Sequence, residues 1–140
     1  MSEFHFHLDK LDGAWILRLR SEDGINRLTE ACLLSLAETI RQLKHHGQAL
    51  IITGNAKFFS AGADLKEIEA LKGPAAFEFS RIGQSLMQSV EHFPTPVYAA
   101  ISGYCMGGGL DWLWRAITVS LRIRHCLGIA ARPGINNRVG

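Results

Sequence analysis

Two stretches of small residues in this 140-residue chain follow apolar segments and could do chemistry: "GNAKFFSAGADLKEI", residues 54–68, and "GYCMGGGLD", residues 103–111. Small side chains let a ligand approach the main chain closely. A helix that begins directly after each stretch would present unpaired N–H groups and the positive end of its dipole to the ligand. Two such donors, converging on one oxygen from different loops, would form an oxyanion hole.

Other kinds of site are less well supported by the residue pattern. A lone Gly-Gly-Gly is more often a tight turn than a site, so the pair of loops matters more than either loop. Cys105 follows an apolar strand and is expected in the core, and neither Ser60 nor Ser102 lies in a G-x-S-x-G turn. The sequence contains no Walker A or G-x-G-x-x-G pattern, and its histidines show no metal-ligand spacing.

The elements that would position these loops follow from hydrophobic periodicity. "FHFHLDK" and "AWILRLRS" alternate with period two and predict a hairpin that turns at Asp12 and Gly13. The next segment predicts a helix between an N-cap at Thr29 and a stop at Gly47, and a second helix begins near Pro74. "QALIITG" and "TPVYAAISG" read as strands buried on both faces. The alternation predicts an α/β fold with mostly parallel central strands.

Composition favours one globular domain, with 47% hydrophobic and 20% charged residues. Residues 1–111 hold ten Lys and Arg against thirteen Asp and Glu, whereas residues 112–140 hold five Arg and no acid. A basic tail can bind nucleic acid, but no nucleic-acid-binding module accompanies it, so we expect no nucleic-acid partner. The sequence shows neither a signal peptide nor a membrane-spanning run, which predicts a cytoplasmic protein without a membrane partner. Three cysteines without CxxC spacing favour free thiols.

The two loops resemble a known family. "KFFSAGADLKEI" (57–68) is similar to the first signature of the crotonase superfamily, the enoyl-CoA hydratase/isomerase family. "PVYAAISGYCMGGGLD" (96–111) is similar to the strand and turn of its second signature. The resemblance extends over residues 3–111, which we expect to be the N-terminal part of such a domain. It implies an α/β fold of the crotonase-like (ClpP/crotonase) type, a ββα spiral, of which this chain holds the N-terminal portion only.

The resemblance also implies roles for particular residues. The thioester carbonyl of an acyl-CoA or enoyl-CoA substrate would accept hydrogen bonds from the backbone N–H groups of Ala63 and Gly108, which stabilise an enolate. The loop from Ala61 through Asp64 to Leu65 would bind the CoA portion.

Position 111 matches a catalytic glutamate of the hydratases, but it is Asp111 here. It could equally be a helix N-terminal residue favoured by the dipole. The resemblance implies no metal and no separate cofactor, because coenzyme A is part of the substrate. It implies homo-trimers or hexamers for the full-length relatives.

The sequence departs from the family pattern directly after Asp111. The family continues with a helix of the type "LALACDYRIA", whereas this chain reads "WLWRAITVSLRIRHC". Tryptophan has the single codon TGG, so Trp112-Leu113-Trp114-Arg115 can be written TGG CTN TGG CGN. Grouped one base earlier, these bases can spell Leu-Ala-Leu-Ala. We therefore expect residues 112–140, an atypical basic tail, to be out of frame through the loss of one nucleotide near codon 111.

The expected function has two levels. The family resemblance implies a lyase or isomerase of fatty acid metabolism that transforms an acyl-CoA thioester through a stabilised enolate. The alternative is an inactive truncated fragment with no catalytic function, because the second acidic residue of the hydratases and the later α/β turns of the family are missing. A nucleic-acid binder that uses the arginines of the tail is the third and weakest reading.

Overall fold

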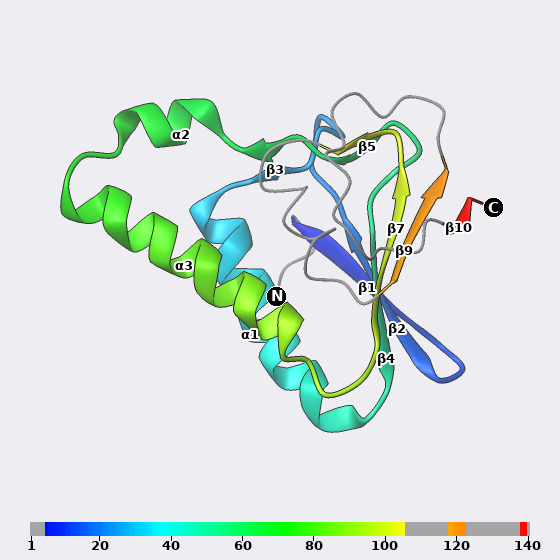
Figure 1. Ribbon diagram of the computed structural model, residues 1–140. Helices are drawn as coiled ribbons and strands as arrows, with labels where there is room; N and C mark the ends of the chain where they lie inside the picture. The colour runs from blue at the N-terminus through cyan, green and yellow to red at the C-terminus, as the bar shows by residue number, and fades with distance from the viewer. Residues whose placement is uncertain (1–4, 106–117, 123–137, 140) are drawn as a thin grey trace.

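Two helices lie against one face of the larger β-sheet in the part of the chain that the structure describes (Figure 1). The computed structural model describes residues 5–105, 118–122 and 138–139. Within them the larger sheet has the strand order β1-β2-β4-β7-β9-β10. These strands are β1 Phe6–Leu11, β2 Ala14–Leu19, β4 Ala49–Thr53, β7 Val97–Ser102, β9 Thr118–Arg122 and β10 Arg138–Val139. The helices are α1 Glu30–Leu43, α2 Leu65–Ala70 and α3 Pro74–Glu91, with a 3-10 turn η1 at Lys44–His46.

The N-terminal hairpin forms one edge of this sheet. β1 and β2 pair antiparallel from Phe6 opposite Leu19 to Leu11 opposite Ala14. Gly13 in the predicted turn has φ +78°, a conformation in which glycine has no Cβ penalty. From β2 onward, each neighbouring pair of strands in the order β2-β4-β7-β9-β10 is parallel. The prediction of an α/β fold with mostly parallel central strands is confirmed.

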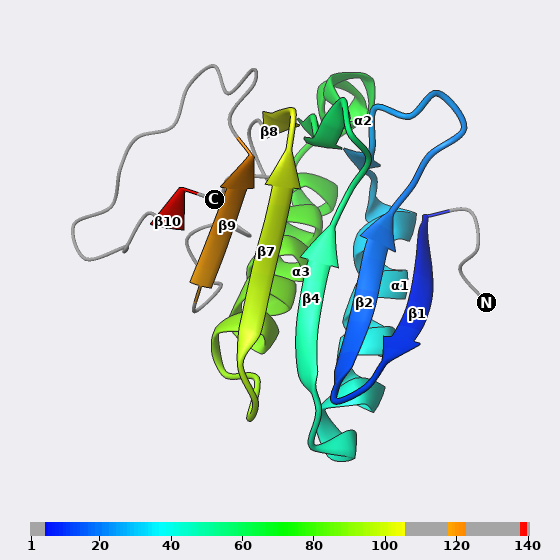
Figure 2. The ribbon, with the colours of Figure 1, turned by 90° about the vertical axis from the view of Figure 1, so that its right-hand side faces the viewer.

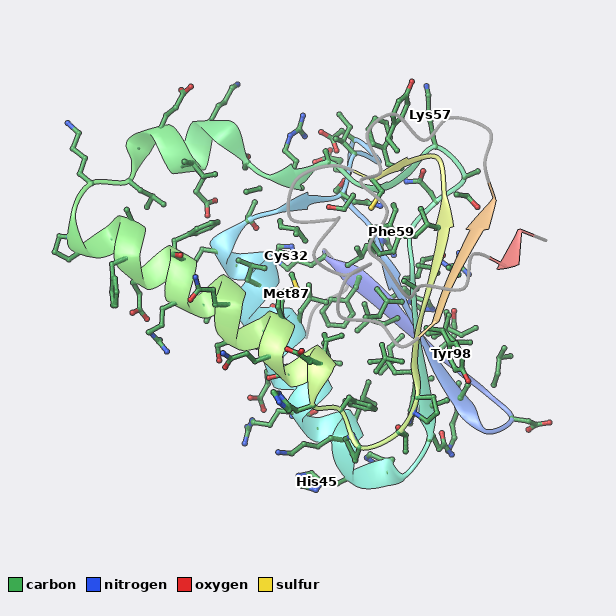
Figure 3. All side chains as sticks on the ribbon, in the orientation of Figure 1. Cys32, His45, Lys57, Phe59, Met87 and Tyr98 are labelled. Atoms are coloured by element: carbon green, nitrogen blue, oxygen red, sulfur yellow. The ribbon has the colours of Figure 1, made fainter. Side chains whose placement is uncertain are left out.

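Helices α1 and α3 each bury an apolar face against the sheet. α1 begins where the sequence predicts, because the Thr29 hydroxyl accepts a hydrogen bond from the Cys32 N–H at 3.2 Å. α3 begins with Pro74 in its first turn, where a missing N–H costs nothing. Figure 3 labels Cys32 on α1 and Met87 on α3, which both belong to the buried core. Full burial of a side chain such as Leu36 contributes about 2 kcal/mol relative to exposure.

The central strands β4 and β7 do not have two buried faces, so that prediction from their apolar runs was wrong. Leu50 and Ile52 of β4 are buried, whereas Ile51 between them is only half-buried. Tyr98 of β7 keeps 36% of its surface exposed and lies on the side away from the helices (Figure 3). Figure 2 shows that face of the sheet, with α1 and α3 behind it. Alternate side chains of each strand therefore face outward although they are apolar.

Two short pairs of strands continue from the carboxyl ends of the central strands. β3, Arg27–Leu28, pairs in parallel with β6, Gly62–Ala63. β5, Phe58–Ser60, pairs in parallel with β8, Tyr104–Cys105, which lies beyond the arrowhead of β7 (Figure 2). Ligands of open α/β sheets bind at this edge. The short pairs therefore place the loops of interest where the sequence predicts a site.

Candidate functional site

Ala61 and Ala63 lie in the short segment that joins β5 to α2. Ala61 donates its N–H to the carbonyl of Ile25 at 3.1 Å. Ala63 is half-buried in β6, opposite Leu28 of β3. These contacts hold the backbone of the segment against the residues that precede α1. A backbone N–H can act as a hydrogen-bond donor to a ligand only if its main chain is held in a fixed position.

The next two predicted residues start helix α2. Asp64 is its N-cap, and the Asp64 Oδ1 accepts a hydrogen bond from the Lys66 N–H at 3.0 Å. Leu65 is the first helical residue. The prediction that a helix begins directly behind the small residues is confirmed. The other two predicted residues, Gly108 and Asp111, lie outside the described residues.

The two predicted loops meet side by side through β5 and β8. The Tyr104 N–H donates to the Lys57 carbonyl at 2.9 Å, and Ser60 is paired with Cys105. Gly103 has φ +78°, and a Cβ there would lie 2.2 Å from the Lys57 carbonyl oxygen. Only glycine allows this approach of one loop to the other. The structure therefore brings the loops together as far as Cys105, the last described residue of the second loop before the gap.

A buried hydrogen-bond cluster, formed by Asn26 and Ser60, aligns β3 with β6. The Asn26 amide nitrogen donates to the carbonyls of Phe58 and Phe59 at 3.2 and 3.1 Å. The Ser60 hydroxyl donates to the Asn26 carbonyl at 2.7 Å and accepts from the Gly62 N–H at 3.0 Å. Asn26 and Ser60 are 3% and 0% exposed. We call this set the Asn26–Ser60 cluster.

Sequence reasoning missed Asn26, and it predicted Ser60 as a small, packed residue beside the ligand without identifying its hydrogen-bond partners. Asn26 has φ 57°, in the left-handed region that asparagine tolerates better than other residues with a side chain. The signal was an asparagine shortly after Asp-Gly, at a position where the chain must turn between β2 and α1. The expectation that Ser60 is not a nucleophile agrees with its buried, doubly bonded hydroxyl.

Two hollows with different linings lie beside Ala63 and Asp64. The apolar cavity, of about 330 Å³, lies between β3, β6, α1 and α3. Its walls include Leu28, Leu33, Ala63, Phe79, Gly83 and Met87. The polar pocket, of about 580 Å³, is open to solvent. Its walls include Arg20, Ser21, Asp23, Arg27, Thr29 and Asp64.

Strand alternation explains the difference between the hollows. Leu28 lines the apolar cavity, while its chain neighbours Arg27 and Thr29 line the polar pocket. On β6 and the following residue, Ala63 and Asp64 divide in the same way. Successive side chains of an extended strand point to opposite faces, so one short ladder separates an apolar space from a polar one.

A tight turn at Asp23 forms one wall of the polar pocket. The Asp23 carboxylate accepts hydrogen bonds from the Ile25 N–H at 3.0 Å and the Ser21 hydroxyl at 2.9 Å, and it pairs with Arg27. The hydrogen bond from the Ile25 N–H lowers the pKa of Asp23 most, followed by the bonds from Arg27 and Ser21. Together they lower the pKa of Asp23 from 3.8 to about 2. The turn is therefore held by a charged carboxylate at neutral pH.

The two described cysteines, Cys32 and Cys105, are both buried. Burial raises the pKa of the Cys32 thiol to about 12, so it stays protonated at neutral pH. Cys105 is 4% exposed, as its predicted core position requires. Within the described residues no three His, Cys, Asp or Glu side chains are placed to hold a metal ion. The helices described here are also too short or too polar to cross a bilayer.

Comparison with known proteins identifies what this fold and loop pair are similar to. A sequence profile of the family described as enoyl-CoA hydratase/isomerase matches residues 12–116. A Bacillus subtilis protein named as a probable enoyl-CoA hydratase is 40% identical over 89 residues, covering 61% of this chain and 34% of that protein. A crotonyl-CoA hydratase from Syntrophomonas wolfei is 31% identical over 107 residues, covering 74% of this chain and 41% of the hydratase.

A solved structure confirms the fold class. The crystal structure of an enoyl-CoA hydratase from Bacillus anthracis superimposes with a TM-score of 0.77 at 28% sequence identity. The match covers 82% of this chain and 46% of that one. The predicted crotonase-like α/β fold is therefore confirmed. The chain spans between a third and a half of the length of these relatives.

Replacing Ser60 with alanine should destabilise the fold by about 2 kcal/mol, because the Asn26 carbonyl and the Gly62 N–H would lose a buried partner. Urea unfolding of both proteins measures the difference. Ser89→Ala is the matched control, since its exposed hydroxyl bonds only within α3 and its loss should cost less than about 0.5 kcal/mol. Equal stability of Ser60→Ala and Ser89→Ala would contradict the role of the cluster.

Replacing Asp23 with asparagine should lower stability at neutral pH but not in strong acid. The pKa of Asp23 is lower in the folded than in the unfolded chain, so its charge stabilises the fold fully above pH 3.8. This contribution is lost as the pH falls towards about 2. Thermal unfolding at several pH values should show the variant less stable than the unaltered protein at pH 6. The difference between their unfolding temperatures should disappear near pH 2. Asp12→Asn gives the same charge change in the hairpin turn, and an identical pH dependence there would refute the assignment.

Proposed function

The chain belongs to the enoyl-CoA hydratase/isomerase family, and from this membership we propose that it binds an acyl-CoA thioester whose carbonyl oxygen accepts a hydrogen bond from the Ala63 N–H. The observation that carries this proposal is the position of Ala63, which lines the apolar cavity while the next residue, Asp64, lines the polar pocket. An acyl-CoA has an apolar acyl chain and a polar CoA portion, joined at the thioester. The thioester would therefore lie beside Ala63.

The two hollows assign the two parts of the substrate. The acyl chain enters the apolar cavity, whose volume of about 330 Å³ suits a short or medium chain. The CoA portion follows the polar pocket along Asp64. The lining of this pocket holds the acidic residues Glu22, Asp23 and Asp64 as well as Arg20 and Arg27, and Arg27 is paired with Asp23, so Arg20 is proposed to contact the CoA phosphates. The segment from Ala61 to Leu65 thus forms the CoA-binding loop, as the family resemblance implies.

The proposed chemistry is stabilisation of an enolate by main-chain donors. As a proton leaves or a nucleophile adds, negative charge develops on the thioester oxygen, and the Ala63 N–H stabilises it without side-chain movement. Gly108 is proposed as the second donor and Asp111 as the acid or base, both from the resemblance alone. The reaction class is a lyase or isomerase reaction of an enoyl-CoA, with no cofactor apart from the CoA of the substrate.

Filling the apolar cavity should shorten the acyl chain that the protein accepts. A Cβ at Gly83 would meet only the Leu33 Cδ1, at 3.9 Å, so the helix tolerates a side chain there. Gly83→Leu would project into the cavity and should weaken hexanoyl-CoA binding by about tenfold or more, while acetyl-CoA binding changes less than about twofold. Isothermal titration calorimetry with both thioesters measures the two affinities.

Ser85→Leu on the exposed side of the same helix is the matched control and should change neither affinity. Equal weakening of acetyl-CoA and hexanoyl-CoA by Gly83→Leu would show that the acyl chain lies elsewhere. Failure of the folded, unaltered chain to bind any thioester would contradict the proposed function and favour the alternative, an inactive fragment with no catalytic function.

We also infer that the reading frame changes near codon 111, which would divide the chain into a family segment, 3–111, and an out-of-frame segment, 112–140. The match to the family profile ends five residues beyond this boundary, at residue 116. The codons of Trp112–Arg115 support the frame change, because they can spell Leu-Ala-Leu-Ala when they are grouped one base earlier. If the lost base was the third base of a glutamate codon, the original residue at position 111 was glutamate rather than aspartate.

Resequencing the gene should therefore reveal either one additional base near codon 111 or, one frame over, an open reading frame that continues through a further α/β region. The restored frame should spell a Leu-Ala-Leu-Ala segment in place of Trp112–Arg115. A downstream frame that is closed by early stop codons, together with thioester binding by the 140-residue chain itself, would refute the frame change and make the basic tail part of the protein.

A further inference from the structure

Glu67 connects helix α2 to the first turn of helix α1. Its Oε1 accepts a hydrogen bond from the Glu30 backbone N–H at 2.7 Å. Among residues 66–70 of α2, Glu67 is the half-buried side chain and the others are exposed, with Ile68 at 40%. These residues of α2 therefore bury little apolar surface. The hydrogen bond between Glu67 and the Glu30 N–H fixes the position of the helix instead.

The contact is favourable for a general electrostatic reason. The first N–H groups of a helix have no partner within the helix, and the positive end of the helix dipole attracts a carboxylate. The Thr29 hydroxyl already accepts from the Cys32 N–H at 3.2 Å. Glu67 serves the Glu30 N–H, so the two side chains satisfy different donors of the same turn.

This bond closes a ring of contacts around the Ala63 backbone. On one side Ala63 is paired with Leu28, and two residues further along that strand the chain enters α1 at Glu30. On the other side Ala63 leads through Asp64 into α2 and to Glu67. The Glu67 bond joins the two far ends of these segments. A change in the tilt of α2 would otherwise act directly on the peptide groups of Ala63 and Asp64.

We propose that Glu67 is a positioning residue, which holds the β6–α2 junction against β3 and α1 so that the Ala63 N–H is aimed at the thioester carbonyl. The proposal rests on the proposed function, because it takes the Ala63 N–H as the donor to the substrate. Glu67 itself does not touch the reacting atoms. It acts through the backbone that follows β6.

Three variants of the full chain test this role. Glu67→Ala removes the acceptor, Glu67→Gln keeps an acceptor oxygen without the charge, and Glu69→Ala is the matched control on the exposed side of the same helix. Two quantities are measured for each: butyryl-CoA affinity by calorimetry, and amide hydrogen exchange by NMR at residues 62–66 and Glu30. Glu67→Ala should weaken binding about tenfold and speed exchange at these amides about tenfold, with β4 unaffected. Glu67→Gln should restore both to within about threefold, and Glu69→Ala should change neither.

The two readouts separate the failure of this inference from failure of the proposed function. Faster exchange in Glu67→Ala with unchanged butyryl-CoA affinity would overturn the positioning role, and so would equal loss of affinity in the Gln and Ala variants. Unchanged exchange in Glu67→Ala would overturn the ring of contacts itself. If the unaltered chain binds no butyryl-CoA, the proposed function fails. Faster amide exchange in Glu67→Ala alone would still show that the Glu67 hydrogen bond restrains the Ala63 backbone.

Discussion

Burial of the Ser60 hydroxyl and the Asn26 amide is the constraint on which the rest of the site depends. Both groups are almost fully removed from water, so each must find partners within the protein or cost free energy. The partners they find are main-chain groups of residues 26, 58, 59 and 62. These bonds tie the turn after β2 to strand β5 and the start of β6. The register of β3 against β6, and with it the position of the Ala63 backbone, follows from that tie.

Once the register is set, strand alternation determines the chemistry of the space on either side. Leu28 and Ala63 turn towards the helices and complete an apolar cavity, while Arg27 and Asp64 turn towards solvent and line the polar pocket. The proposed substrate has the same division, because an acyl-CoA joins an apolar acyl chain to a polar CoA portion at one carbonyl. Close approach of the second loop at Gly103 adds a neighbouring backbone to the same edge of the sheet.

Local patterns were enough to predict the hairpin, the start of α1 at Thr29, the start of α3 at Pro74 and the parallel order of the central strands. They failed where tertiary contacts decide. The apolar run of β4 does not reveal that Ile51 faces a side without a described helix, and no periodicity shows that Asn26 and Ser60 bond to one another. The motif residues Ala61 to Leu65 were found because their small size and the helix signal behind them are local. The contact of Glu67 with α1 depends on a distant segment and has no local signature.

The central claim is that the backbone at Ala63 receives a thioester carbonyl between an apolar and a polar space. A crystal structure of the full chain with bound butyryl-CoA tests it most directly. The account predicts the carbonyl oxygen within about 3 Å of the Ala63 nitrogen, with the butyryl chain in the cavity beside Gly83 and the CoA portion along Asp64. A carbonyl turned away from Ala63, or an acyl chain outside that cavity, would contradict it.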